Sequence, residues 1–543
     1  MKDSLGKKTK RSIRNELFAI ATGLVLGFFY VAGYTLEKYD NVNFGDKSFY
    51  FKWILVSGLA TILVFGVWKL TDFLRMKQFT LPWTDMGWYK KINQFKLPLG
   101  GYALILFLLW IPAWLSIFPG AFAYDAPDEL RQIAEWDVNS HHPVLHVLWL
   151  GGFVQLAYDL TGSYNLGIAI YTVMQMILLA FVFGYTIKFL EEENIGGAWR
   201  LATLLFYGLS PVVQLFSISA TKDTMFAGVA LLFLISVYRL TCKTEQFWVS
   251  RRWRILFVVS ALFTMILRNN GLYIAVLTLI GVILGLKNQR KRLLGLCGIV
   301  LLFYLFYIGP VYKMLGVQKG GVEEMLSVPL QQLARVHYYD KESIEDEDLR
   351  LMYDIVPEKN WEAYRPSVSD FVKVGFQREA FQERKADCLR LWIKLGLKKP
   401  MTYLNSILLG TVDFWYPHAI VDGYRDVYGR SSFFDYQVCE PGKEIVLLKG
   451  IHQGYEYLST DKAAQTIPGI FLLISQGWYL LISMVVFLYL WSRKEYQRMA
   501  PMMILVWNMM TVLLGPVALV RYVLILFYVF PVLPVLLKRW KND

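Results

Sequence analysis

Cysteine is scarce in this sequence, which has four cysteines in 543 residues and no CxxC pair. Their spacing fits neither a disulfide framework nor a zinc site. Cys388 and Cys439 are the two that we expect outside the membrane, where they can pair or remain separate thiols. Internal repeats of fixed period and low-complexity segments are also missing, which disfavours solenoids and transporters built from inverted repeats.

Charged residues are few as well, at 18% of the chain against 55% hydrophobic residues. With a mean hydropathy of +0.38, this composition is too apolar for a soluble globular protein. The net charge of +13 comes largely from short basic clusters between apolar runs, such as 251–254 and 287–292. This pattern is typical of positive-inside membrane topology and not of nucleic-acid binding. We therefore predict an all-α polytopic protein of the lipid bilayer.

Long apolar runs predict about twelve membrane helices. A spanning helix needs about 20 apolar residues, and runs that meet or approach this length lie near 16–37, 51–73, 99–118, 164–188, 197–217, 223–241, 254–286, 291–314, 467–491, 499–518 and 519–537. The run 254–286 is too long for one crossing and has basic clusters at both ends, so we expect a hairpin with Arg268 to Gly271 at its tip. No small-residue cleavage site follows the first run, so we expect an uncleaved membrane helix there and not a signal peptide.

The run from Val144 to Leu160 is at the lower length limit for a span. If it crosses the membrane, the basic clusters at 251–254 and 287–292 fall outside the cell. If it does not cross, every cluster and both termini are cytoplasmic. We therefore predict a juxtamembrane or re-entrant helix on the outer side.

This topology divides the chain into four regions. Residues 1–98 form a cytoplasmic tail and two additional membrane helices, and 99–316 form a membrane core whose first outward loop is 119–163. Residues 317–465 form a small extracytoplasmic domain of short helices, and 466–543 return to the membrane.

The stretch from Phe118 to His146 carries the most unusual charges, because its acidic residues stand at a predicted membrane boundary. A carboxylate in a partly desolvated pocket can have a raised pKa and act as a general base, which makes Asp125 and Asp128 candidate catalytic residues. The alternative is that they cap the helix that begins near Pro127. This alternative is stronger for Asp128 and Glu129, which lie in the first helical turn.

Further polar residues gather at predicted outer helix ends. His141 and His142 are suited to hydrogen bonding with a substrate or with Asp125, or to a structural role, and two adjacent histidines make a poor metal site. The remaining polar residues at these helix ends can hold a lipid phosphate, can pair with one another, or can extend toward the membrane interface. They are Lys222, Asp223, Arg268, Asn269, Arg521 and Tyr522.

Several of these segments resemble a known group of enzymes. FPGAFAYDAP, HHPVLH, GSYNLGIAIYT, SATKDTMFA, LRNNGLY and EMLSVPLQQLAR occur in an order that is similar to an uncharacterised bacterial membrane family, whose members look like GT-C superfamily glycosyltransferases. The resemblance covers roughly residues 100–540.

The resemblance implies inverting sugar transfer at the outer face of the bacterial cytoplasmic membrane. The donor would be a polyprenyl-phosphate-linked sugar, and the acceptor a glycan, glycolipid or cell-wall polymer. Asp125 matches the acidic base of the first outward loop best, and Asp128 is second. The segment with Gln331 and Arg335 would cover the site and help to select the acceptor. Fixed cations can stabilise the departing phosphate, so a divalent metal is possible but not indicated.

Two other functions remain open. A polysaccharide polymerase or ligase also has about a dozen helices and a large outward loop, but it predicts basic residues concentrated in that loop, which here carries the acidic run 341–350. A lipid-linked sugar flippase or transporter would place its charges near mid-membrane and would use discontinuous helices and internal repeats.

Overall fold

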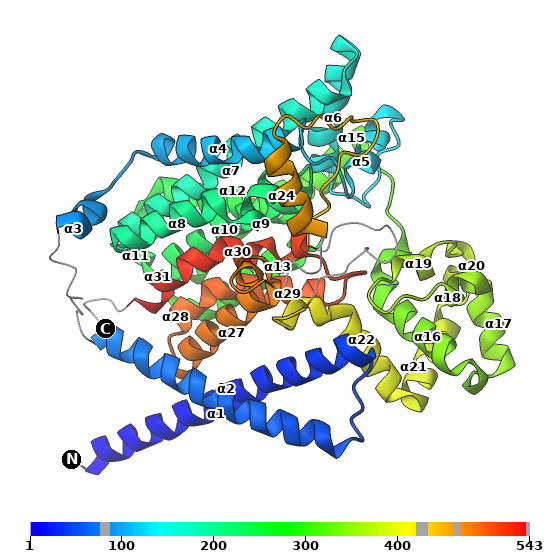
Figure 1. Ribbon diagram of the computed structural model, residues 1–543, viewed down its shortest axis with the longest axis horizontal. Helices are drawn as coiled ribbons and strands as arrows, with labels where there is room; N and C mark the ends of the chain where they lie inside the picture. The colour runs from blue at the N-terminus through cyan, green and yellow to red at the C-terminus, as the bar shows by residue number, and fades with distance from the viewer. Residues whose placement is uncertain (1, 77–86, 420–432, 461–466, 539–543) are drawn as a thin grey trace.

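The fold is seen in a computed structural model, which describes residues 2–76, 87–419, 433–460 and 467–538. Within these residues every named element is a helix, and extended segments meet only in isolated bridges (Figure 1). The predicted all-α class is therefore confirmed. Parts of three predicted regions lie outside the described residues, namely 1 and 77–86 of the region 1–98, 420–432 and 461–465 of the region 317–465, and 466 and 539–543 of the region 466–543.

Eight helices of the described residues are long and apolar enough to cross a membrane, and the protein is a multi-pass membrane protein. They lie at Ile13–Tyr39, Lys47–Arg75, Leu99–Ser116, Val144–Thr161, Tyr164–Glu192, Lys222–Cys242, Lys287–Leu315 and Val520–Leu537. The expected number of about twelve is not reached because several apolar runs are broken. The run 197–217 divides into α8 (Gly197–Leu209) and α9 (Pro211–Ser217), while α27 (Gln476–Ser492) and α29 (Met503–Val512) are shorter than a full span.

The long run 254–286 forms the expected hairpin. It divides into α12 (Arg251–Ile266) and α13 (Gly271–Gly285), and Arg268 lies in the turn between them. Gly271 has no room for a side chain, because a Cβ atom there would overlap the carbonyl oxygen of Thr264. This close approach permits the tight turn at which Arg268 and Asn269 lie.

The N-terminal helices α1 (Lys2–Tyr39) and α2 (Lys47–Met76) form an antiparallel hairpin (Figure 1). Gly23 and Gly27 face Thr61 and Ser57 so closely that a Cβ atom on either glycine would overlap a hydroxyl. Small residues at this spacing allow two membrane helices to approach closely. The hairpin crosses the lower side of the molecule in Figure 1 and packs on α22 (Pro400–Trp415) and α27.

The central bundle has two distinct ends. In Figure 1, α3 (Gly87–Gln94), α11 (Thr244–Val249) and α31 (Leu533–Leu537) lie at one end, which we call the α11 end. At the other end, the α5 end, lie α5 (Ala126–Ala134) and α15 (Tyr312–Leu315). The basic clusters 251–254 and 287–292 share the α11 end, since the guanidinium of Arg292 lies 5.7 Å from the ring centroid of Trp248.

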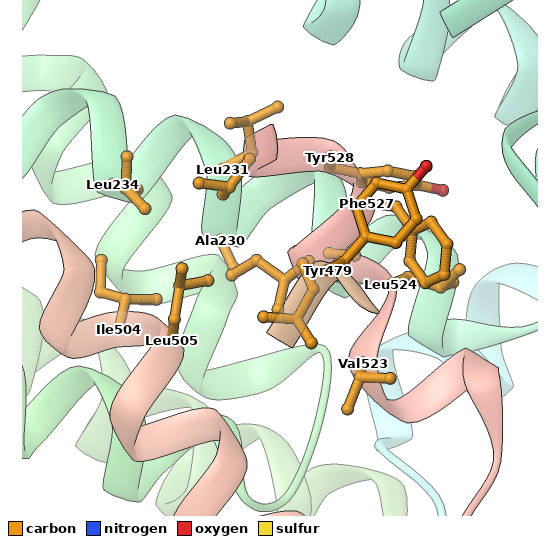
Figure 2. Packing of buried hydrophobic residues seen from close by; sticks show 14 of the residues in the cluster. Ala230, Leu231, Leu234, Tyr479, Ile504, Leu505, Val523, Leu524, Phe527 and Tyr528 are labelled. Carbon is orange, nitrogen blue, oxygen red and sulfur yellow. The ribbon is translucent and has the colours of Figure 1, made fainter. Parts of the chain in front are cut away.

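The core of the bundle surrounds α10 (Lys222–Cys242), which is the most buried of the candidate spans. Figure 2 shows Ala230, Leu231 and Leu234 of α10 near residues of α27, α29 and α30 (Leu524–Val529). Tyr479 and Phe527 have ring centroids 4.2 Å apart in this cluster. This packing holds the short helix η7 (Val520–Val523), which carries Arg521, beside the first turn of α10.

Helix α6 (Val144–Thr161) forms an antiparallel hairpin with α7 (Tyr164–Glu192). The rings of Tyr158 and Tyr164 stack beside the turn, and Gly167 packs closely against Val154 further along. Helix α4 (Leu99–Ser116) covers the later part of α7, where Gly184 approaches Leu99. Helices α6 and α4 thus cover different parts of α7. Because α6 has the length and hydropathy of a candidate span, its placement outside the membrane stays a prediction.

Residues 322–398 form a helical domain at the α5 end with a hydrophobic core of its own. Its central helix is α16 (Ser327–Asp340), and the surrounding helices are α17 (Asp346–Ile355), α18 (Glu358–Glu362), α19 (Asp370–Lys373), α20 (Arg378–Glu383) and α21 (Lys385–Lys398). The thiol of Cys388 is free, so the pairing of Cys388 with Cys439 that the sequence left open is not formed.

Candidate functional site

The loop after α4 brings Asp125 next to α10. Residues 118–125 run beside the segment before α10, where the amide of Ala121 donates to Ile218 and the carbonyl of Ala121 accepts from Ala220. Gly120 adopts a φ of +131°, and a side chain there would overlap Thr172. Because glycine tolerates this conformation and this contact, the loop can follow the 218–221 segment closely and end at Asp125.

Five charged residues from four parts of the chain form one continuous series, which we call the charge chain: Lys222, Asp125, Arg521, Asp223 and Arg268. The ammonium of Lys222 lies 2.6 Å from Asp125 Oδ2, and Arg521 Nη1 lies 2.9 Å from the same oxygen. Arg521 Nη1 also lies 3.5 Å from Asp223 Oδ2, and Arg268 Nη1 lies 3.0 Å from Asp223 Oδ1. Positive and negative groups thus alternate along the series.

Two tyrosines flank the arginines of the charge chain. The guanidinium of Arg521 lies 4.6 Å from the ring centroid of Tyr124 and 4.8 Å from that of Tyr522. The guanidinium of Arg268 lies 4.5 Å from the ring centroid of Tyr522. Cation–π contacts at such distances restrict the orientation of both arginines, so the positive groups are held in place from the side as well as by carboxylates.

Asp125 is ionised under ordinary conditions. Its side chain is 25% exposed. Burial favours the neutral form, but the charges of Arg521 and Lys222 outweigh it and hold the pKa of the Asp125 carboxyl well below its usual range. The direction is opposite to the raised pKa that the sequence suggested. Asp125 is the N-cap residue of α5, but its side chain makes no capping hydrogen bond, so capping does not explain it either.

His142 connects the charge chain to Asp128. Its Nδ1 lies 2.8 Å from Lys222 Nζ, and its Nε2 lies 3.0 Å from Asp128 Oδ2. Asp128 also accepts hydrogen bonds from Arg131 at 2.6 Å and from Gln132 at 3.1 Å. The bond from His142 and those from Arg131 and Gln132 outweigh burial and lower the pKa of the Asp128 carboxyl. Asp128 is therefore a fixed anionic acceptor behind the imidazole.

A second polar chain lies deeper, behind Lys222. Glu129 is 1% exposed, lies 3.6 Å from Lys222 Nζ and is hydrogen-bonded to His146 Nδ1. His146 Nε2 lies 2.8 Å from the hydroxyl of Tyr171, which donates to Gln175 Oε1 at 2.9 Å. Burial opposes ionisation of Glu129, but the charge and hydrogen bond of His146 lower the pKa of its carboxyl. Lys222 therefore faces two carboxylates.

Asp125, Glu129 and His142 also have the spacing of a metal site, since their ligand atoms lie within 4.8 Å of one another. The ammonium of Lys222 is within 3.6 Å of all three. A metal ion would have to displace this ammonium to reach the same ligands. The group of residues thus fits one cation at a time, and in this structure Lys222 supplies it.

An apolar groove is lined by residues that neighbour the charge chain in the sequence. It has a volume of about 410 Å³ and lies between α6, α7, α10 and α12. Its lining includes Leu145, next to His146, and Leu267, next to Arg268. Leu178, Val259 and Phe263 of the lining are exposed, so the groove opens on the outside of the bundle. Its full lining is Leu145, Trp149, Leu178, Val182, Met225, Val229, Leu232, Leu256, Val259, Ser260, Phe263 and Leu267.

The structure brings together eight of the residues singled out from the sequence: Asp125, Asp128, His142, Lys222, Asp223, Arg268, Arg521 and Tyr522. His141 is exposed beside them, with its ring centroid 4.4 Å from that of His142. Asn269 is directed at the backbone, where it donates to the carbonyl oxygens of Ser140 and His141. Asn269 thus connects the loop that carries His141 and His142 to the turn between α12 and α13.

Gln331 and Arg335 lie elsewhere, inside the helical domain. Gln331 donates to the carbonyl oxygens of Arg365 and Pro366. Arg335 donates to the hydroxyl of Tyr364 at 2.9 Å and to the carbonyl oxygen of Asp40 at 2.7 Å. Both side chains hold neighbouring backbone or side chains together, and among the described residues no hydrogen bond or ion pair joins either of them to the charge chain. Their expected role in acceptor selection stays a prediction.

Residues 137–543 match Family of unknown function (DUF6020). The chain belongs to this family. The matched region of this DUF6020 protein includes His142, Lys222, Arg268 and Arg521, and it begins after α5. No curated protein and no solved structure matches the chain.

Sequence reasoning missed the deeper chain of Glu129, His146 and Tyr171 as a functional unit. Tyr171 lies in an apolar run, where an aromatic residue is an ordinary core residue. His146 closes the segment HHPVLH, and Glu129 follows Asp128 directly. The available signal was the presence of a histidine within an apolar helix start, because a buried polar side chain needs a partner.

Proposed function

We propose that this protein is a glycosyltransferase of the GT-C type, which moves a sugar from a polyprenyl-phosphate donor to an acceptor hydroxyl with inversion. The observation that carries the proposal is the charge chain, together with an apolar groove whose lining includes Leu267, the residue before Arg268. An anionic headgroup with a long apolar chain has the two properties that these neighbouring features accept.

The cations would bind the phosphate by exchanging partners. Lys222 and Arg521 share Asp125, and Arg521 and Arg268 share Asp223. A donor phosphate between these cations would replace part of their contacts with the carboxylates. As the bond between the sugar and the phosphate breaks, negative charge grows on the phosphate oxygen, and preorganised cations stabilise it.

The apolar groove would take the first isoprenoid units of the donor. Met225 lies one turn beyond Lys222 in α10, and Leu267 precedes Arg268. A phosphate at these cations therefore directs its chain into the groove. Each CH₂ group removed from water contributes about 0.8 kcal/mol, although membrane lipid competes for the same chain. The groove thus acts mainly to orient the donor.

Asp125 and Asp128 are the two candidate carboxylates for the base that accepts the hydroxyl proton. Two cations hold Asp125 in its ionised form, and three hydrogen-bond donors do the same for Asp128. A carboxylate with a lowered pKa is a weak base. In this proposal Asp125 therefore serves chiefly to hold Lys222 and Arg521 in place.

The proposed reaction takes place at the outer face of a bacterial cytoplasmic membrane, with both termini inside. The basic clusters 251–254 and 287–292 support this orientation, since they lie together at the α11 end, opposite the charge chain. A glycan, glycolipid or cell-wall polymer would be the acceptor, and nucleic acid has no part in the reaction.

The proposal is tested with the full chain in lipid nanodiscs. A panel of polyprenyl-phosphate sugars labelled in the sugar is supplied with glycan and glycolipid acceptors, and mass spectrometry follows release of polyprenyl phosphate and transfer of the label. We expect at least one donor to be consumed. Arg521→Gln should lower kcat/KM by at least about 100-fold, because it removes a charge that faces the phosphate.

The matched control is Arg239→Gln. Arg239 is another buried guanidinium, at the opposite end of α10, where it pairs with Glu192 at 2.6 Å. Its replacement should cost stability without lowering kcat/KM of the remaining folded protein. Equal activity of Arg521→Gln and the unaltered protein would contradict the phosphate site. Release of polyprenyl pyrophosphate would instead indicate a polymerase or ligase, and movement of intact donor across the bilayer would indicate a flippase.

A further inference from the structure

The hydrogen bonds of His142 define its tautomer. Lys222 is an ammonium group and can only donate, so Nδ1 of His142 accepts its hydrogen bond with a lone pair. Asp128 is an ionised carboxylate and can only accept, so Nε2 carries the hydrogen that is donated to it. The imidazole is therefore neutral, with its basic nitrogen directed toward the charge chain and its N–H directed away from it.

This arrangement has the elements of a general base. An imidazole oriented by a carboxylate on one nitrogen uses the lone pair of its other nitrogen to accept a proton from a hydroxyl in many hydrolases and transferases. Asp128 is held in position by Arg131 and Gln132, and His142 has a side chain that is only 7% exposed. Nδ1 lies 4.0 Å from Asp125 Oδ2, which places it beside the proposed phosphate site.

We propose that His142 accepts the proton of the acceptor hydroxyl, and that Asp128 positions its imidazole. This inference rests on the proposed sugar transfer and assigns its base to a histidine instead of a carboxylate. The ammonium of Lys222 covers Nδ1 until the donor binds. When the donor phosphate draws Lys222 toward itself, Nδ1 becomes available to the acceptor.

The step balances without any further reactant. The acceptor O–H bond breaks, its proton moves to Nδ1 of His142, and the oxygen forms a bond to the anomeric carbon. The bond from that carbon to the phosphate oxygen breaks, and its electron pair leaves with polyprenyl phosphate, facing Lys222 and Arg521. The imidazolium formed is stabilised by Asp128 and loses its proton to water after the product departs.

The test compares His142→Gln with His452→Gln in full-chain nanodiscs. Glutamine can still donate to Asp128 but offers no basic nitrogen, so we expect His142→Gln to lower kcat for transfer by at least about 100-fold. Binding of unlabelled polyprenyl phosphate should change less than threefold. His452 lies in α24 (Lys449–Thr460), with its Nδ1 3.0 Å from the carbonyl oxygen of Ser116, and its replacement should leave kcat within about threefold of the unaltered protein.

Asp128→Asn separates positioning from folding. An asparagine can donate to Nε2 and so favour the other tautomer, whose Nδ1–H faces the ammonium of Lys222. We expect a loss of kcat with an unchanged KM for the donor, and restoration by Asp128→Glu. Transfer at the normal rate by a folded His142→Gln protein would overturn the inference and leave the proposed function intact. If the unaltered protein consumes no donor, the proposed function and this role fail together.

Discussion

Asp125 joins cations from distant parts of the chain, Lys222 at 97 residues away and Arg521 at 396. The side chains of these cations are 11% and 4% exposed. A buried charge that loses its partner is strongly destabilising, by about 3–5 kcal/mol. The carboxylate therefore contributes to stability as well as to the geometry of the proposed phosphate site.

Asp125→Asn should lower the apparent Tm at pH 7, and the difference from the unaltered protein should shrink in acid. Because the folded-state pKa of Asp125 is lowered, its stabilisation is fully present above the pKa of the unfolded chain, about 4, and is lost as the pH falls through the lower folded-state value. Thermal unfolding in detergent at pH 7, 5 and 3.5 measures this. Asp159→Asn, at an exposed aspartate of α6, is the control. A difference that grew toward low pH would contradict the ion pairs.

The sequence predicted the members of the charge chain but not their pairing. Lys222, Arg268 and Arg521 stand out because each interrupts or borders an apolar run, where an unpaired charge is energetically costly. The pairing of each cation with a carboxylate depends on the loop 118–125 and on the packing of η7 against α10. Neither of these features can be recognised from a local sequence pattern. The lowered pKa of Asp125 could not be predicted for the same reason, since it depends on those partners.

At the scale of elements, α6 decides the topology. Its first turn carries His146 beside Tyr171, and its last residues meet the start of α7 at the stacked rings of Tyr158 and Tyr164. The hairpin thus extends away from the charge chain toward its 161–164 turn. A helix that begins at the site and leaves it in this way suits a juxtamembrane element.

Cysteine labelling tests this placement. In a background with the four native cysteines replaced, we expect Gly162→Cys to react with a membrane-impermeant maleimide added to intact cells, and Glu192→Cys to react only after the membrane is opened. Gly162 ends α6, Glu192 ends α7, and α7 separates them by its full length. Thr244→Cys in α11 should behave like Glu192→Cys. The reverse pattern at the first two positions would show that α6 crosses the membrane.

Over the whole molecule, composition was sufficient to predict an all-α multi-pass protein, because no soluble fold accommodates this hydropathy. The hairpin at Arg268 to Gly271 was also predicted correctly from length and charge. Fewer helices of the described residues reach the length of a span than the sequence predicted, because hydropathy does not register a break such as that between α8 and α9 at Ser210 and Pro211. Tertiary contacts, not local composition, determine where these short helices end.

The N-terminal hairpin is attached to the rest of the molecule at both of its ends. Near the α11 end, Arg493 lies 2.5 Å from Asp72, and Arg75 lies 2.8 Å from Glu495. Near the α5 end, Asn405 accepts a hydrogen bond from the amide of Val42 at 2.7 Å. The hairpin precedes the region that matches the family, yet these contacts bind it to α22, α27 and α28 (Tyr496–Met499).

Breaking the two ion pairs should loosen the hairpin without affecting the proposed reaction. In the double variant Asp72→Asn, Arg75→Gln, charge-assisted hydrogen bonds to Arg493 and Glu495 are lost, and each is worth about 1.5–3 kcal/mol. We expect the apparent Tm to fall by roughly 2–4 °C or more, with unchanged kcat, because both pairs lie at the α27–α28 junction and the charge chain lies at the α5 end. Lys52→Gln, at an exposed residue of α2, controls for the loss of a charge. A fall in kcat without a fall in Tm would mean that the hairpin takes part in the site.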